Sequence, residues 1–162
     1  ANAICVKGQY DVTITLPTPP PGTYEIRLGY VAGVERGVVQ VYLNNDPCGI
    51  PIDLRVYAGD PTIGVIIDAA DKEEDLANDK ALHNRGYMRG MDSYRKPGAT
   101  SFRVDAWAEH MRRILTTTQV KEGQELKLRF RQVLEGDSEW SFDYIELCPK
   151  SVYASPEGED TH

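Results

Sequence analysis

The chain has 162 residues, a formal net charge of −7 and an isoelectric point near 5.0, with 41% hydrophobic and 27% charged residues. These values suit a soluble globular protein with a real hydrophobic core, and no apolar run approaches the roughly 20 residues that a membrane-spanning helix needs. The acidic balance excludes a nucleic-acid partner from the expected functions, because phosphate backbones require a basic face. Arg112 with Arg113, and Arg129 with Arg131, are interpreted as solvated strand faces.

Period-two alternation of apolar and polar side chains dominates the first part of the chain and predicts β-strands. The predicted strands cover residues 9–16, 23–31, 37–43, 50–57 and 62–67. The proline-rich run 17–22 cannot supply enough backbone donors for a strand, so we expect a loop there. Turn-forming residues at 44–47 separate the third strand from the fourth.

The middle of the chain, residues 68–95, is rich in charge and differs from its flanks. Apolar residues at helical spacing, acidic residues at the start and the terminator Gly86 predict a short helix over 73–84. The acidic run 68–79 lacks the glycine that a calcium-binding loop needs at its turn, so it is interpreted as a solvated helix start. The whole segment is interpreted as an insertion or long connection, where binding residues are often found.

The β pattern returns towards the C-terminus. Residues 102–115 fit a helix in part, whereas 113–120 fit a strand, and both interpretations stay open. Residues 125–134 alternate clearly, Gly123 marks the preceding turn, and 140–147 form the last predicted strand.

About eight short strands without a βαβ rhythm predict an all-β fold, an antiparallel β-sandwich or jelly roll with a short helical insertion. We expect one domain over residues 1–154 and a flexible acidic tail over 155–162. Residues 1–10 lack the basic start and apolar stretch of a signal peptide. The chain is therefore interpreted as a mature form or as a piece of a longer protein.

Cysteine usage leaves the redox compartment open. Cys5, Cys48 and Cys148 are too few and too scattered for a disulfide framework or a zinc site. One disulfide with one free thiol, and three buried free thiols, are both compatible with the sequence.

Four segments carry a family resemblance. They read G-T-Y-E-I-R-L-G-Y over 22–30, V-Q-V-Y-L-N-N over 39–45, L-K-L-R-F over 126–130 and F-D-Y-I-E-L over 142–147. In this order they resemble the strands of galactose-binding-like β-sandwiches, the fold of many carbohydrate-binding modules. The sequence around C-G-I-P-I-D at 48–53 also resembles C-terminal domains, without an assigned activity, of Bacteroidetes surface lipoproteins, some of them joined to fasciclin-type adhesion domains.

The resemblance implies a non-catalytic accessory module that binds glycans at the bacterial cell surface or in the periplasm. It also implies neighbouring domains in a longer surface protein, with no direct membrane insertion by this chain. The alternative is a structural or adhesion domain that contacts protein partners. Many carbohydrate-binding members hold a structural calcium with a glutamate-rich first strand, where this chain offers only Asp11.

Aromatic side chains near predicted loops are candidates for sugar binding, because the apolar C–H faces of sugar rings stack on Tyr and Trp while polar neighbours bind the hydroxyls. The candidate ligand-binding residues are Arg85, Tyr87, Arg89, Asp92, Tyr94, Trp107 and Trp140. Residues 87–95 are the preferred binding surface. Packing in the core or at its rim is the alternative for each aromatic residue.

Asp143 is the candidate metal ligand. If alternation continues along the last strand, Asp143 shares a face with Ile145 and Leu147 and points inward. An inward carboxylate must be ion-paired, hydrogen-bonded or metal-bound. By resemblance it is a candidate ligand of a structural calcium ion, and the alternative is hydrogen bonding to backbone amides at a strand end.

Catalysis has little support in the sequence. Glu25 and Glu146 lie on strands that could be neighbours, and paired carboxylates can cleave glycosides. Carboxylates on outward strand faces are usually solvated, however, and a small sandwich must build a deep cleft from its loops. His83 and His110 lack any accompanying catalytic motif. We therefore expect a protein that is not an enzyme.

Overall fold

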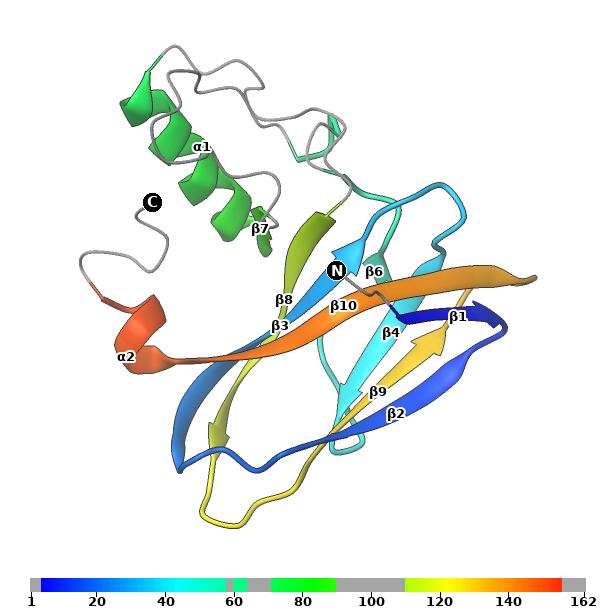
Figure 1. Ribbon diagram of the computed structural model, residues 1–162, viewed down its shortest axis with the longest axis horizontal. Coiled ribbons are helices and arrows are strands. Elements are labelled where there is room, and N and C mark those ends of the chain that lie inside the picture. Colours follow the sequence, from blue (N-terminus) through cyan, green and yellow to red (C-terminus); the bar gives the residue numbers. More distant parts are fainter. Residues whose placement is uncertain (1–3, 58–59, 64–70, 90–109, 156–162) are drawn as a thin grey trace.

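The computed structural model describes residues 4–57, 60–63, 71–89 and 110–155, and it describes the backbone alone at Asp75 and Arg89. Two antiparallel sheets face each other (Figure 1), which confirms the predicted all-β sandwich with a short helix. The first sheet has the order β1-β10-β3-β8-β7, with bounds Ile4–Gly8, Ser138–Pro149, Gly22–Val31, His110–Val120 and Tyr87–Arg89. The second has the order β2-β9-β4-β5, with bounds Asp11–Leu16, Leu126–Gln132, Val38–Leu43 and Asp46–Pro47. Strand β6 (Ile52–Asp53) pairs with β4, and the helices are α1 (Lys72–Asn84) and α2 (Lys150–Tyr153).

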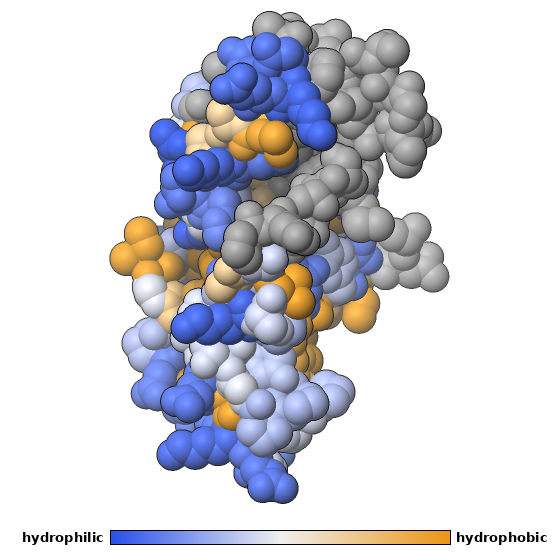
Figure 2. All heavy atoms as spheres, turned by 90° about the vertical axis from the view of Figure 1, so that its left-hand side faces the viewer, coloured by the Kyte–Doolittle hydropathy of each residue, from blue (hydrophilic) through white to orange (hydrophobic). Residues whose placement is uncertain are grey.

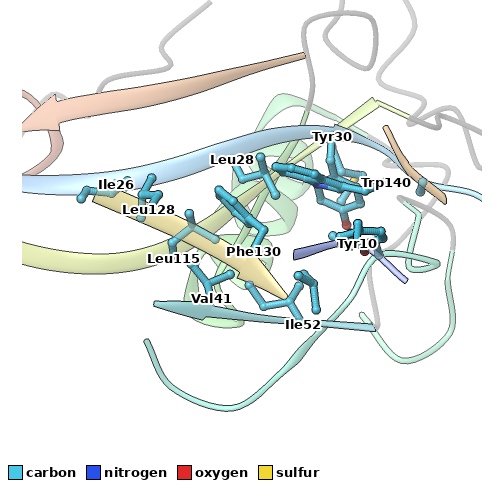
Figure 3. Packing of buried hydrophobic residues seen from close by; sticks show 14 of the residues in the cluster. Tyr10, Ile26, Leu28, Tyr30, Val41, Ile52, Leu115, Leu128, Phe130 and Trp140 are labelled. Atoms are coloured by element: carbon cyan, nitrogen blue, oxygen red, sulfur yellow. The ribbon is translucent and has the colours of Figure 1, made fainter. Parts of the chain in front are cut away.

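Alternation along the strands builds the core between the sheets. Every second side chain of a strand points to the same face, so the inward positions of β3 and β9 meet across the sandwich. Ile26, Leu28 and Tyr30 of β3, with Leu128 and Phe130 of β9, are at most 1% exposed. Figure 3 shows these side chains gathered between the two sheets.

One end of the core is aromatic. Trp140 is fully buried and stacks with Phe142 and Tyr10 at centroid distances of 4.3 and 5.8 Å, and it also contacts Phe130 at 4.4 Å. Figure 3 shows Trp140 and Tyr10 at this end of the core. Trp140, a candidate ligand-binding aromatic residue beside a predicted loop, therefore packs in the core, which was the alternative for each aromatic residue. It lies within β10, at an inward position.

The predicted strand over 50–57 is the largest error within the described fold. Only Ile52 and Asp53 pair, with β4. The Asp53 carboxylate accepts a hydrogen bond from the backbone N–H of Arg55 at 3.0 Å, which turns the chain after two residues. Ile50 is 81% exposed, so its place in the apolar pattern does not reflect burial. Of the strand predicted over 62–67, residues 62 and 63 form a turn and the others lie outside the described residues.

The sequence prediction also missed β1. Its residues alternate weakly in burial and end at Gly8, whose φ of +95° allows the chain to cross to the second sheet. The strand predicted from residue 9 begins at Asp11, because Gln9 and Tyr10 form this crossing. Of the ambiguous segment 102–115, the described part from His110 onward is strand.

Helix α1 confirms the prediction over 73–84 to within one residue. Asp71 caps it, with its carboxylate accepting a hydrogen bond from the Glu74 N–H at 2.9 Å. At the other end Gly86 has φ +81°, and a Cβ there would lie 1.7 Å from the Arg113 Nη1. Only glycine fits where the helix meets β8. None of the described helices combines the length and hydrophobicity that crossing a membrane requires.

Figure 2 shows the side that carries both helices. Among its described residues this face is mainly hydrophilic, and its hydrophobic side chains form separate small patches. All three cysteines are free: Cys5 is exposed, Cys48 is half-buried and Cys148 is buried. Neither prediction for the cysteines is correct as it stands, since no disulfide forms and only one thiol is fully buried.

Candidate functional site

A hollow opens at one end of the sandwich, beside the crossing from β1 to β2 and the loops β3–β4 and β9–β10. Its volume is about 550 Å³, within the range typical of small-molecule sites. We call it the loop-end hollow. Its wall is formed by Lys7, Gly8, Val34, Glu35, Gly37, Arg55, Gln132, Leu134, Glu135, Asp137, Ser138 and Glu139. It is therefore assembled from segments that are far apart in the sequence.

Two glutamine side chains hold the β9–β10 loop at this hollow. The amide of Gln132 donates hydrogen bonds to the carbonyl oxygens of Leu134 and Gly136 at 3.3 and 2.9 Å. Gln9 donates to the same two carbonyls from the other side. The neighbouring β3–β4 loop is tied to β10 by the Glu139 N–H, which donates to the Glu35 carbonyl at 2.9 Å. The loops are thus pre-arranged by the protein itself.

Gly37 allows the β3–β4 loop to approach β10 closely. Its φ is +46°, and a Cβ at this position would lie 2.6 Å from the Ser138 Oγ. A larger residue would push Ser138 away from the wall of the hollow.

The two basic residues of the wall, Lys7 and Arg55, are both held in ion pairs. Lys7 Nζ lies 2.7 Å from one carboxylate oxygen of Glu139, and the Arg36 guanidinium binds the other. The hydrogen bond from Lys7 is the main reason that the pKa of Glu139 lies below its usual value. Arg55 forms a bidentate pair with Asp53, with both N–O distances 2.8 Å, and this pair lowers the pKa of Asp53.

Several buried polar atoms around this end lack a hydrogen-bond partner within the described part of the chain. They are Tyr10 Oη, Gln132 Oε1, Ser138 Oγ and Trp140 Nε1. Gln132 and Ser138 also line the hollow. Buried polar atoms are rarely left unpaired in folded proteins, so Gln132 Oε1 and Ser138 Oγ are candidates to receive polar ligand groups, whereas Tyr10 and Trp140 belong to the core.

Tyr10 makes this end sensitive to alkaline pH. Burial raises the pKa of Tyr10 to about 12, and the nearby Ser138 hydroxyl offsets part of this increase. The unfolded chain loses this proton near pH 10, before the folded protein does. Stability that is fully present below pH 10 is therefore lost between pH 10 and pH 12.

We expect Tyr10→Phe to remove the part of the alkaline loss that Tyr10 contributes, while Tyr30 and Tyr87, whose pKa values are also raised by burial, keep theirs. The two-unit shift corresponds to about 2–3 kcal/mol of unfolding free energy between pH 10 and pH 12. Below pH 9 the variant should be close to the wild type, because the hydroxyl that it removes has no partner. Urea unfolding at pH 9 and at pH 11.5 measures both effects. An equal loss of stability in the two proteins would contradict this assignment.

A second cluster of charged groups lies on the outer face of the first sheet. Arg27, which is 1% exposed, donates to Glu25 at 2.7 Å and to Glu146 at 2.6 Å. Arg112 lies 3.7 Å from the same Glu146 oxygen, and His83 of α1 lies 3.7 Å from Glu25. The sequence interpretation of these glutamates and of Arg112 as solvated is wrong, because Glu25 and Arg112 are buried and Glu146 is largely covered.

Part of the predicted binding surface lies at the junction of α1 and β7. Arg85 is exposed and donates back to the Ala81 carbonyl at 3.1 Å. Tyr87 is half-buried, and the Arg113 guanidinium lies over its ring at 4.6 Å. Arg113 also donates to the carbonyls of Arg85 and Gly86 at 3.2 and 2.7 Å. One face of the Tyr87 ring is therefore occupied by a residue that the sequence interpretation had placed on a solvated face.

The structure does not describe the side chains of Arg89, Asp92, Tyr94 and Trp107, the other candidate ligand-binding residues. Arg89 is on β7, where only its backbone is described. Asp92, Tyr94 and Trp107 lie outside the described residues. Their binding role stays a prediction.

Asp143 lies at a β-bulge, where the register of β10 against β3 shifts between Phe142 and Tyr144. Phe142 and Ile145 both pack against the core although they are three residues apart, so the alternation is broken between them. Tyr144 lies over Gly29 on the outer face of the sheet. The alternation from which Asp143 was expected to point inward with Ile145 is therefore broken, and the residue is half-buried at the bulge.

The described residues contain no group of three or more His, Cys, Asp or Glu side chains that could hold a metal ion. Asp143 thus has no such companions within that part of the chain, and the structural calcium implied by the resemblance stays a prediction.

The loop-end hollow was not identified from the sequence. The turn at 135–138 was predicted, but its neighbours across the hollow come from β1 and from the β3–β4 loop. The only local signal was the polar turn itself, between two clear strands. Comparison of the chain with protein-family models, curated proteins and solved structures finds no match.

Proposed function

We propose that this chain is a non-catalytic binding module of the bacterial cell surface or periplasm, and that it binds a glycan in the loop-end hollow. The observation that carries the proposal is a hollow of about 550 Å³ whose wall contains unpaired polar groups held by pre-arranged loops. Sugar hydroxyls both donate and accept hydrogen bonds, so carboxylates, an amide and a hydroxyl suit them. The extracytoplasmic location follows from the sequence resemblance.

Apolar side chains at the rim support the same ligand class. Val34 is 87% exposed and Leu134 is 41% exposed, and both line the hollow. Sugar rings have apolar C–H faces beside their hydroxyls, and these faces could lie against such side chains. Exposed aromatic rings are not needed for this mode of contact.

The carboxylates of Glu25 and Glu146 do not have the setting that glycoside cleavage needs. Glu25 and Glu146 are both bound by the same buried guanidinium of Arg27. A general acid and a nucleophile must face the glycosidic bond in an open cleft. Glu25 is only 6% exposed, so it has no such access.

The test is a glycan array probed with the intact chain in the presence of calcium, followed by titration calorimetry with any retained glycan. Asp137→Ala should weaken binding roughly tenfold, because a hydrogen bond to a charged group contributes about 1.5–3 kcal/mol. Glu122→Ala is the matched control, since Glu122 is an exposed carboxylate in the turn at the other end of β9. A blank array, or equal losses with both variants, would contradict the proposal.

A structural or adhesion role is the second candidate. It is favoured by three exposed apolar side chains at the same end of the sandwich, Val34, Val133 and Leu134. This role predicts a blank glycan array. It also predicts that Val34→Asp loosens the contact with a neighbouring domain in a longer protein that contains this chain, measured by small-angle X-ray scattering.

A further inference from the structure

The wall of the loop-end hollow has more acidic than basic groups. Its charged residues are the carboxylates Glu35, Glu135, Asp137 and Glu139 and the cations Lys7 and Arg55. Both cations are already ion-paired, Lys7 with Glu139 and Arg55 with Asp53. Within the described part of the chain, no ion pair or hydrogen bond involves the carboxylates of Glu35, Glu135 and Asp137. With the ion-pair partners Asp53 and Arg36 included, five carboxylates face three cations, so two negative charges around the hollow are not balanced.

The unpaired buried groups of the wall can also receive hydrogen bonds. Gln132 is 5% exposed, and its Oε1 receives no hydrogen bond, while its amide N–H groups are used by the loop carbonyls. Ser138 Oγ is likewise unpaired. These two atoms are independent of the carboxylates, since one belongs to the end of β9 and the other to the start of β10. A ligand that complements the hollow must bring donors.

The arrangement does not suit a metal ion. The described residues contain no set of three acidic, histidine or cysteine side chains close enough to hold one. The charges are instead distributed around a space of about 550 Å³, which fits an organic cation with several donor groups. An ammonium group offers three donors and a positive charge.

We infer that the ligand of the loop-end hollow is a glycan that carries protonated amino groups, an amino sugar, in preference to neutral or acidic sugars. This inference rests on the proposed function and narrows its ligand class. The ammonium group lies among the carboxylates of Glu35, Glu135 and Asp137, and the sugar hydroxyls donate to Gln132 and Ser138. The net charge of −7 attracts such ligands from a distance.

The test uses two probes of equal length, a glucosamine tetramer and its fully N-acetylated, neutral counterpart. Calorimetry at pH 6 and low salt should show binding of the amine form at least tenfold tighter than that of the neutral form. The preference should fall when salt is raised, because partly exposed charges are screened. The double variant Glu135→Gln/Asp137→Asn should abolish the preference. Glu122→Gln, which removes one exposed charge at the other end of the domain, should leave it intact.

Three results would overturn the inference. Equal or tighter binding of the neutral tetramer, or preferential binding of acidic glycans on the array, would contradict the amino-sugar assignment and leave glycan binding in place. A preference that survives the double variant would show general attraction to an acidic protein. Absence of binding by every glycan on the array and by both tetramers would remove the proposed function together with the inference.

Discussion

Replacement of Arg27 by methionine is expected to lower the free energy of unfolding by about 3–5 kcal/mol. The guanidinium is 1% exposed and is shared by Glu25 and Glu146, at 2.7 and 2.6 Å. Removing it leaves a buried carboxylate without its strongest partner, and the cost of that desolvated charge exceeds the value of the ion pair itself. Urea unfolding followed by circular dichroism at pH 7 measures the change.

Arg129→Met is the matched control. Arg129 likewise donates two hydrogen bonds to carboxylate oxygens, both of them of Asp11, at 2.7 and 2.6 Å, but its side chain is 40% exposed. An exposed pair contributes about 0–1 kcal/mol, so the loss should be several times smaller. Adding Glu25→Gln and Glu146→Gln to Arg27→Met should restore much of the stability, because the buried charges go with their partner. Similar losses for Arg27→Met and Arg129→Met would contradict the burial argument.

Trp140→Ala is the other substitution with a large expected effect. The indole is fully buried among Tyr10, Phe130 and Phe142. Its removal should cost about 3–5 kcal/mol, from lost transfer free energy and from the cavity left behind. Thermal or urea unfolding followed by far-UV circular dichroism gives the value without depending on tryptophan fluorescence.

Trp140→Phe distinguishes a role of Trp140 in core packing from a role in glycan binding. It keeps an aromatic ring in the cluster and removes an indole N–H that has no hydrogen-bond partner in the described part of the chain, so its cost should be much smaller than that of the alanine variant. Because Trp140 lies in the core, Trp140→Phe should leave glycan affinity unchanged. A loss of affinity without a loss of stability would return Trp140 to the binding site.

The strands could be predicted where burial follows the local pattern. Strands β3 and β9 are found within one or two residues of the predicted ranges, because backbone geometry alone sends alternate side chains to opposite faces. Helix α1 could be predicted for the same kind of reason, since Asp71 caps it and Gly86 ends it through local geometry. The segment after Gly49 misled the prediction because its apolar residues alternate while Asp53 turns the chain.

The candidate site depends on contacts that no local pattern contains. Residues 7–8, 34–37 and 132–139 meet at the hollow only after the two sheets pair and their loops close. The β-bulge in β10 interrupts the alternation of side chains between Phe142 and Tyr144. The direction of Asp143 could therefore not be predicted from the positions of Ile145 and Leu147.

The sequence by itself determined the acidic net charge, the alternation that forms two antiparallel sheets, and the capped helix in the middle of the chain. Each of these follows from neighbouring residues and backbone geometry. Only the tertiary structure decided which polar groups are buried and which partners they have. Whether a glutamate such as Glu25 is solvated depends on the arginine beside it and on the helix that reaches over it. Likewise, whether the carboxylates of a turn face a hollow depends on strands more than a hundred residues away along the chain, since Lys7 and Glu139 meet only in the folded sheet.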